Sequence, residues 1–326
     1  MRDRFTRTKR SYDYRLPPAR QFGERPLDFS GQLAPRVPEL GVHTIRNATV
    51  VGPGWVLDRD RSVVPSISWH GVAEKGPDRI RETHELGGTA ITLGTTWGNH
   101  YGHMVPDGLS RLGLIPDRFL RRADRILVPH TREAPQARLL LHRMGIDTRV
   151  VEMEWSHAYK VDRLYAPTFP GLRRQYDAVV PDTLRGAMPE PVETRKLFVT
   201  RRGYSRNPSQ VAEVESMAAE IGYEIYDPMQ SGDQALDFRN AIAVAGVSGS
   251  GLTGIGYMRP GARVFEMFSD AHLFAYYASL SAAGDLVYGY AIGQSPDNQK
   301  VSGASTADFE VDLAAVAAGL HWAAGR

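Results

Sequence analysis

The sequence predicts an α/β protein with two domains, and three observations support this prediction. Its second half alternates β-type runs with helical stretches, as expected for a parallel sheet covered by helices. A glycine-rich turn, Ser248-Gly249-Ser250-Gly251, separates one β-type run from a helical stretch. The chain has 326 residues, of which 42% are hydrophobic, and this suffices for two hydrophobic cores.

The first half begins with runs rich in β-branched residues that glycine and proline separate. This pattern indicates antiparallel strands over 44–51, 63–69 and 89–93. A regular alternation follows, with a helix over 107–114, a strand over 125–129, a helix over 133–144 and a strand over 148–151. We therefore predict an N-terminal α/β domain over 41–170, with extra antiparallel strands near its start.

The second half predicts a further α/β domain over 171–326. Its expected strands are 196–200, 223–226, 241–247, 263–268 and 286–290. Its expected helices are 209–221, a short one before the glycine turn, 252–258 and 308–323. Gly222 is the expected stop of the first of these helices, because glycine is the usual residue just after a helix end.

Residues 1–40 read as a basic arm and linker. Residues 1–20 carry Arg2, Arg4, Arg7, Lys9, Arg10, Arg15 and Arg20 against two aspartates. Pro17-Pro18 interrupts any helix there, so we expect a flexible, solvated arm over 1–20. A peripheral contact of this arm with acidic lipid is compatible with its charge.

Composition excludes several classes of protein. There is no cysteine, which excludes disulfides, thiolate metal sites and cysteine nucleophiles. The net charge of +2 and the lack of a nucleic-acid-binding motif predict no nucleic-acid partner. No apolar run reaches the roughly 20 residues of a membrane helix, and the N-terminus lacks the apolar core of a signal peptide. A cytoplasmic location is the resulting expectation.

The glycine turn is suited to binding phosphate. Backbone N–H groups at a helix start can approach an anion there, and the helix dipole favours negative charge. Gly249, Gly251 and Gly254 also satisfy the G-x-G-x-x-G spacing of a dinucleotide-binding turn. That motif needs an acidic residue about 20 positions later. Glu266 comes too early for it and Asp270 too late, so the dinucleotide interpretation is weak.

The surroundings of the turn resemble bacterial members of glycosyltransferase family 61, with its signature G-P-H-G-A-G-L-T-N, then P-P-G, then V-L-E-L-F. The matching segments are Gly246 to Gly254, Arg259-Pro260-Gly261 and Val264 to Phe268. Three residues depart from the family pattern: Ser248 replaces its histidine, Ser250 its alanine and Arg259 its first proline.

Two further blocks extend the resemblance. Asn99 to Leu112, NHYGHMVPDGLSRL, is similar to the family block N-x-x-H-W-x-x-D-x-L-P-R-L. Leu197 to Gly203, LFVTRRG, is similar to the family's I-S-R-R strand end. Together the blocks cover about residues 85 to 290.

The resemblance implies a GT-B-like fold, in which two Rossmann-like domains face a cleft. It implies an inverting glycosyltransferase, a hexosyl- or pentosyltransferase that uses a nucleotide-diphosphate sugar. The acceptor would be a glycan, a lipid-linked glycan or another hydroxyl compound, in bacterial cell-surface polysaccharide biosynthesis. No metal cofactor is obligatory in this scheme, although a divalent metal is compatible with it.

Donor-binding residues follow from the charge of a diphosphate. Arg201 and Arg202 end a predicted strand, where ligands bind in open α/β sheets, and guanidinium groups pair with phosphate oxygens. The turn would add N–H groups from Gly249, Ser250, Gly251 and Leu252 and hydroxyls from Ser248 and Ser250. Through the resemblance, Asn99 joins the donor site, and Glu266, taken as a strand end, would accept ribose hydroxyls.

The catalytic candidates are His103 and Asp107, four residues apart. An inverting transfer needs a base for the acceptor hydroxyl. We predict Asp107 as this base with His103 assisting, although a carboxylate could equally orient a histidine that takes the proton. If Pro106 begins a helix, His103 lies in the loop before it. His100, His103 and Asp107 could form a small metal cluster, but we predict no metal there.

Two other functions remain open at this stage. The departures at Ser248 and Arg259 would suit a noncatalytic relative that binds a nucleotide sugar or glycan. The weak dinucleotide motif leaves an NAD(P)-dependent oxidoreductase as a third class.

Overall fold

The computed structural model describes residues 4–29, 31–52, 54–68, 75–95, 97–98, 100–130, 134–146, 149–296 and 307–325. The chain divides into two compact units. Unit 1 comprises residues 1–14, 35–172 and 182–187, and unit 2 comprises 15–34, 173–181 and 188–326. Each unit has its own sheet and core, and each is described by itself.

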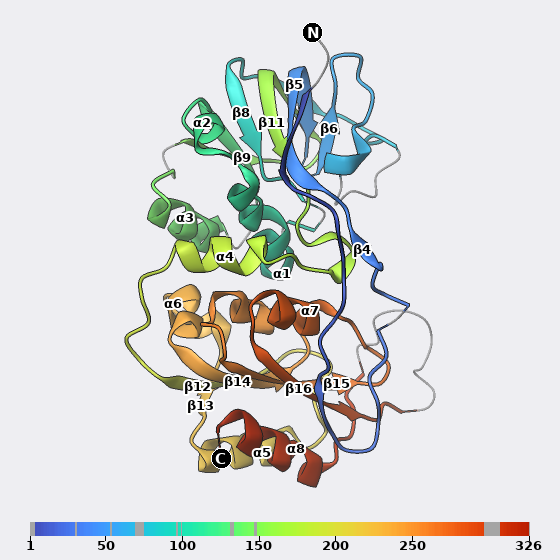
Figure 1. Ribbon diagram of the computed structural model, residues 1–326, viewed down its shortest axis with the longest axis vertical. Helices are drawn as coiled ribbons and strands as arrows, with labels where there is room; N and C mark the ends of the chain where they lie inside the picture. The colour runs from blue at the N-terminus through green and yellow to red at the C-terminus, as the bar shows by residue number, and fades with distance from the viewer. Residues whose placement is uncertain are drawn as a thin grey trace. The chain divides into compact units, whose positions relative to one another are not determined.

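Unit 1 is built on a mixed sheet (Figure 1). Its strands are β1 (Arg4–Lys9), β5 (Leu40–Val51), β6 (Trp55–Leu57), β7 (Glu82–Glu85), β8 (Thr89–Thr92), β9 (Arg125–Pro129), β10 (Val150–Met153) and β11 (His157–Pro167). The order is β1-β5-β11-β8-β9-β10, with β6 on β5 and β7 on β11. Buried residues such as Val50, Leu127 and Leu164 form the core against this sheet. A short separate ribbon pairs β2 (Tyr12–Asp13) with β4 (Arg36–Val37).

Two sequence predictions for the first half are wrong. Residues 89–93 were expected in an antiparallel strand, but β8 pairs in parallel with both β11 and β9. The expected strand over 63–69 is reduced to one bridge at Val63, after which Pro65–Ile67 forms the 3-10 turn η1. Pro65 has a fixed φ and no N–H to donate, so it ends strand pairing there. Trp69 lies outside the described residues.

The long strand β11 was not predicted. It pairs with β5 on one side and with β7 and β8 on the other, so it lies inside the sheet. Its sequence HAYKVDRLYAP mixes charged and apolar residues, and the charged ones mask the β-type pattern. β11 is therefore held by its partners rather than by strong local preference.

The helices of unit 1 are short. They are α1 (Tyr101–His103), the π-helix η3 (Met104–Gly108), the 3-10 helix η4 (Leu109–Leu114), α2 (Asp117–Leu120) and α3 (Ala134–Arg143). The helix predicted over 107–114 thus begins earlier, at Tyr101, and changes type along its length. The single-turn η6 (Leu172–Arg174) and α4 (Val179–Gly186) follow, in the region where the chain passes between the units.

Unit 2 is a doubly wound parallel sheet. Its strands are β3 (Arg20–Phe22), β12 (Arg195–Val199), β13 (Glu224–Tyr226), β14 (Ala241–Val247), β15 (Arg263–Ser269) and β16 (Val287–Gly293). They follow the order β13-β12-β14-β15-β16-β3, and every pairing is parallel. Figure 1 shows α6 (Gln234–Arg239) and α7 (Tyr276–Ala283) on one face and α5 (Val211–Ile221) and α8 (Leu313–Ala323) on the other. The single-turn η7 (Pro228–Gln230) follows β13, and η8 (Ser250–Tyr257) follows β14.

Local sequence explains these elements well. β14 is the small apolar run AIAVAGV, as expected of a strand buried on both faces. α5 ends at Gly222, whose φ of 98° is the left-handed conformation that glycine adopts most easily, so the predicted stop is confirmed. α8 begins at Asp312, whose carboxylate accepts from the backbone N–H groups of Ala314 and Ala315.

The basic N-terminal segment is structured, which corrects the expectation of a flexible arm. Residues Arg4–Lys9 form β1, which pairs with β5 in unit 1. Residues Arg20–Phe22 form β3, which extends the sheet of unit 2 beside β16. Phe22 also packs edge-on against Phe265. The apolar residues between the arginines supply the contacts that an unstructured arm would lack.

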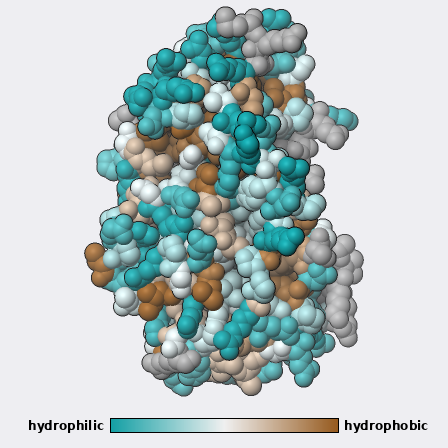
Figure 2. All heavy atoms as spheres, in the orientation of Figure 1, coloured by the Kyte–Doolittle hydropathy of each residue, from teal (hydrophilic) through white to brown (hydrophobic). Residues whose placement is uncertain are grey.

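The surface shown in Figure 2 is mainly polar. Hydrophobic residues occur there as small, separate groups among hydrophilic ones, which is ordinary for a folded protein surface. Within the residues that the structure describes, no helix has the length and apolar character needed to cross a membrane.

Candidate active site

His103 and Asp107 form a hydrogen-bonded pair in unit 1. Nδ1 of His103 lies 2.8 Å from Oδ2 of Asp107. The pair spans the junction of α1 with η3, so Pro106 lies inside the helical stretch rather than at its start. π-helical turns are rare and concentrate at functional sites. In the tautomer in which Nδ1 donates to this carboxylate, Nε2 of the neutral imidazole is the acceptor nitrogen.

The two members of this pair differ in exposure. Asp107 has 1% of its side chain exposed, whereas His103 has 22%. A base must touch the hydroxyl from which it takes a proton. His103 is therefore the more accessible member of the pair, and Asp107 is the buried member.

Arg111 is a buried cation whose charge interacts with that of Asp107. It is fully buried, and its guanidinium donates to the backbone oxygens of Gly94 at 2.5 Å and Pro167 at 3.1 Å. It also lies 4.1 Å above the ring of Phe169. Burial lowers the pKa of Arg111 to about 9, while the negative charge of Asp107 acts in the opposite direction. Arg111 thus supplies positive charge beneath the Asp107 carboxylate.

The aromatic ring of Trp97 lies next to the imidazole of His103. Its ring centroid lies 5.3 Å from that of His103, and the indole is largely exposed. Trp97 has a φ of 52°, one of seven positive φ angles among the non-glycine residues that the structure describes. Such backbone conformations cost roughly 1–3 kcal/mol and gather at functional sites. An exposed aromatic ring beside a base is a suitable surface for a sugar ring.

Two other expectations concern this segment. Asn99, expected at the donor site, lies outside the described residues. His100, His103 and Asp107 do not come together with metal-ligand spacing among the residues that can be assessed.

The glycine turn of unit 2 follows β14 and leads directly into η8. Gly249 precedes the first residue of this 3-10 helix, and Leu252 N–H donates back to the Gly249 carbonyl at 2.9 Å. The N–H groups of Gly249, Ser250 and Gly251 precede the first internal bond of the helix, as at any helix start. The turn therefore offers three N–H donors. The sequence also predicted the N–H of Leu252 as a donor, but this group is already bonded to the Gly249 carbonyl.

Arg201 lies directly against this turn. A Cβ atom placed on Gly249 would lie 1.8 Å from its Nη1 atom. The Arg201 side chain donates to the Ser205 carbonyl at 3.1 Å, but its buried Nε has no partner. Burial lowers the pKa of Arg201, with the hydroxyls of Tyr277 and Tyr204 acting in the opposite direction. A partly desolvated guanidinium whose Nε–H has no partner can donate a strong hydrogen bond to an anion.

Arg201 acts on Arg206, and Arg174, Arg201 and Arg206 all act on His272. We call these four residues the basic cluster: Arg174, Arg201, Arg206 and His272. Burial, and then repulsion by the three arginines, lowers the pKa of His272 to about 4. Its buried Nδ1 has no hydrogen-bond partner. Arg174 and Arg206 have φ angles of 64° and 65°, again the unfavourable left-handed region.

The cluster lies where parallel strands end. Arg201 follows β12, the glycine turn follows β14 and His272 follows β15, and these three strands are neighbours in the sheet. Ligands of open α/β sheets bind at this carboxyl edge. Positive charge accumulates there, and among the described residues no ion pair engages Arg201 or Arg206, so this edge is the candidate anion site.

The other predicted donor residues are placed differently. Arg202 pairs with Glu215 of α5 at 2.5 Å, away from the turn. Ser250 is exposed at the start of η8, whereas Leu252 is fully buried. Ser248 is nearly buried, and its backbone N–H donates to Met267 in β15. Arg259 donates to the Glu193 carbonyl at 2.9 Å, so this departure from the family pattern has a structural contact.

Glu266 is not a strand end. It lies in the middle of β15 with no exposed surface, and its Oε2 accepts from the Tyr288 hydroxyl at 2.6 Å. Burial raises the pKa of Glu266 to about 8, although hydrogen bonding by Tyr288 and Ser248 works against this. A ribose hydroxyl has no access to this carboxyl in the structure. Glu266 acts as a buried, largely protonated group behind the turn.

This pKa predicts how stability depends on pH. The folded chain keeps a proton on Glu266 that the unfolded chain releases near pH 4.5, so stability falls as pH rises from about 5 to 8. The slope should reach about 1.4 kcal/mol per pH unit. Glu266→Gln should remove this slope and leave the variant the more stable protein at pH 8. Urea unfolding at pH 5, 6.5 and 8 would measure the effect, and parallel curves for both proteins would contradict it.

Gly254 bears on the dinucleotide interpretation. A Cβ on Gly254 would lie 2.3 Å from the ring of Phe238 in α6, so this glycine allows η8 to pack on α6. Helix packing therefore explains why a glycine stands at position 254. The presence of Gly254 gives no support to a dinucleotide-binding motif.

Sequence reasoning missed Arg174, Arg206, His272, Trp97 and Arg111. Arg111 belongs to the block that resembles the family, where its position was quoted without a role. His272 follows a strand end and could have been found by the rule that selected Arg201. Arg174, Arg206 and Trp97 have no local signal, because tertiary structure alone brings them to their sites.

Unit 2 has a doubly wound α/β fold with clustered positive charge at the carboxyl edge of its sheet, and comparison with known families specifies the class of protein. Residues 101–265, just over half of the chain, match the family model of Glycosyltransferase 61. The chain belongs to this family, and membership implies glycosyltransferase activity. This favours glycosyl transfer over the dinucleotide oxidoreductase. No curated protein matches the chain significantly.

Proposed function

We propose that the protein is an inverting glycosyltransferase that uses a nucleotide-diphosphate sugar. The observation that carries this proposal is the contact of Arg201 with Gly249, inside a cluster of cations at the carboxyl edge of a parallel sheet. Departure of a nucleoside diphosphate develops negative charge on the phosphate oxygens. The cluster and the N–H groups of the turn are placed to stabilise that charge.

His103 is the proposed base. Its Nε2 would take the proton of the acceptor hydroxyl while Asp107 holds the opposite ring nitrogen and stabilises the imidazolium that forms. The positive charge of Arg111 lies close enough to interact with the Asp107 carboxylate. Trp97 beside the imidazole is the proposed surface for a sugar ring.

The GT-B arrangement remains part of this proposal. In it, unit 2 binds the donor and unit 1 supplies the base. Because Arg174, Arg201 and Arg206 carry positive charge at the donor site, we expect turnover without added divalent metal. The hexosyl or pentosyl type, a glycan acceptor at the bacterial cell surface and a cytoplasmic location stay predictions.

Calorimetry with UDP, GDP, CDP, ADP and dTDP, with EDTA present, tests the donor site. We expect one diphosphate to bind selectively to the wild-type protein. Gly249→Ala should weaken this binding by about tenfold or more, because its Cβ displaces a guanidinium whose charge-assisted bonds are worth roughly 1.5–3 kcal/mol. Gly249 has a φ of 165°, an extended angle that alanine adopts, so folding should be retained.

Gly232→Ala is the matched control, since a Cβ there meets no atom within 4 Å. It should bind like the wild type. Equal affinity of the wild type and Gly249→Ala, or no binding of any diphosphate, would refute the donor site. Hydrolysis of the matching nucleotide sugar would then show whether the bound donor is activated.

A further inference from the structure

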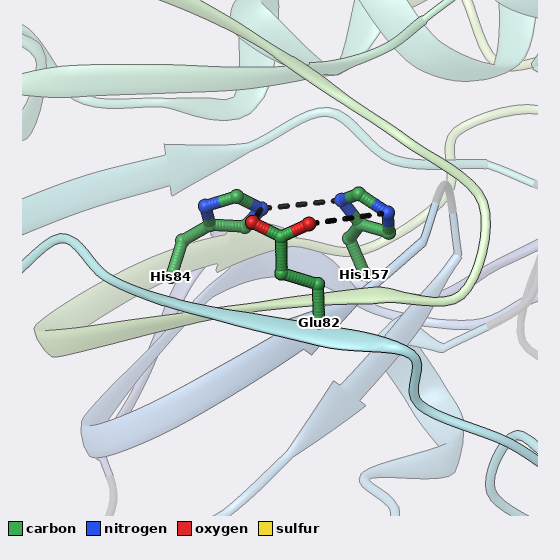
Figure 3. A group of neighbouring side chains, drawn as sticks. All are labelled: Glu82, His84 and His157. Atoms are coloured by element: carbon green, nitrogen blue, oxygen red, sulfur yellow. Dashed lines mark hydrogen bonds and ion pairs between the residues drawn. The ribbon is translucent and has the colours of Figure 1, made fainter.

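Unit 1 contains a second group of chemistry-bearing residues, separate from His103 and Asp107. Glu82 and His84 lie on β7, and His157 begins β11 (Figure 3). β7 and β11 pair in parallel, with Glu82 opposite His157 and His84 opposite Tyr159. Side chains two residues apart on a strand share a face, so this register brings Glu82, His84 and His157 together.

Their ligand atoms have metal-like spacing. Nε2 of His84 lies 3.1 Å from Nδ1 of His157 and 3.6 Å from Oε1 of Glu82. One ligand atom from each residue lies within 4.8 Å of the other two. Atoms bound to zinc at 2.0–2.1 Å in tetrahedral geometry are roughly 3.3 Å apart. His84 and His157 are hydrogen-bonded to each other here, and rotation of their side chains would let all three groups reach one ion.

We propose that Glu82, His84 and His157 bind a divalent transition-metal ion of the zinc type. Two imidazoles and one carboxylate suit zinc and similar borderline ions, whereas magnesium and calcium prefer oxygen ligands only. Water would complete the fourth position, since the three side chains are partly exposed. The ring of Tyr159 stacks on His84 with centroids 4.9 Å apart and fixes the orientation of that imidazole.

The ion would join β7 to β11. In the described part of the chain, β11 is the strand with which β7 pairs. A bound ion would tie this four-residue strand to the interior of the sheet through a second set of contacts. The site is independent of the proposed transfer reaction and its donor.

Zinc binding by the full chain, purified without a polyhistidine tag and treated with EDTA, tests the proposal. Titration calorimetry should show one Zn²⁺ per chain, and zinc should raise the melting temperature. Co²⁺ should give the visible absorption of a four- or five-coordinate ion. Mg²⁺ at the same concentration should do neither.

Two variants remove ligands in different ways. Glu82→Gln keeps the shape of an exposed side chain, and His157→Ala removes an imidazole; each should weaken zinc binding by at least about tenfold. His130→Ala is the matched control, because His130 is also a partly exposed histidine of unit 1 and lies 2.6 Å from Glu152. Its affinity should stay within twofold of the wild type.

Two outcomes would overturn the site. One is a wild-type chain that is folded by circular dichroism but binds no stoichiometric zinc. The other is zinc binding that Glu82→Gln and His157→Ala leave unchanged, which would locate the ion elsewhere. Neither outcome would bear on the donor site, which is measured by diphosphate binding in EDTA.

Discussion

Replacing His103 by alanine is expected to lower kcat by about 10²–10⁴-fold, the usual contribution of a general base. The physical reason is that His103 is the more exposed member of the pair, since Asp107 is buried and lies 2.8 Å from Nδ1 of His103. Donor binding should not change, because the basic cluster belongs to unit 2. Steady-state transfer, with diphosphate affinity measured on the same sample, would check both statements.

His100→Ala is the control for this variant. His100 is an exposed histidine three residues earlier in the same segment, and its loss should leave kcat within about twofold. Asp107→Asn should also lower kcat strongly, because an amide no longer stabilises the imidazolium. Full activity of His103→Ala would remove His103 from the mechanism, and a loss confined to Asp107→Asn would restore Asp107 as the base.

Replacing Arg201 by alanine is expected to weaken binding of the selected diphosphate about tenfold to a hundredfold. That range corresponds to the roughly 1.5–3 kcal/mol of hydrogen bonds to a charged group. Stability should be retained or improve, because the variant removes a partly buried cation whose Nε has no partner. Calorimetry and thermal unfolding would separate the two effects.

Arg202→Ala controls for the loss of an arginine. It breaks the pair with Glu215 but does not touch the turn, so diphosphate affinity should be unchanged. A second readout comes from His272, whose pKa is lowered to about 4 by burial and then by the three arginines. A bound diphosphate should raise that pKa in the wild type, as followed by NMR. Equal affinity in Arg201→Ala and the wild type would exclude Arg201 from the donor site.

Much of unit 2 could be predicted because its signals are local. The run AIAVAGV followed by glycine reads as a buried strand and a turn, and the structure confirms β14 and η8 there. Gly222 marks the end of α5 for the same kind of reason. The spacing of His103 and Asp107 likewise placed both on one helical face, which their hydrogen bond confirms.

The errors occur where pairing between distant segments decides the result. β8 is parallel because it pairs with β9 and β11, and its own four residues do not encode that direction. Glu266 looked like an exposed strand end, yet β14 and β16 flank it and cover it completely. Burial by neighbouring strands thus converted an expected ribose ligand into a protonated interior group.

The candidate sites show the same difference between features that local sequence determines and features that tertiary structure determines. Residue types and spacing were enough to indicate an α/β protein, the glycine turn and the proximity of His103 to Asp107, and the ordered motifs carried the resemblance to glycosyltransferase family 61, because these features depend on residues close in sequence. Tertiary structure alone brought His272 close to Arg201 and Arg174, and register alone placed His157 beside Glu82. The reason is that charge and metal-ligand geometry depend on distances in space, and segments about 70 or more residues apart carry no local record of those distances.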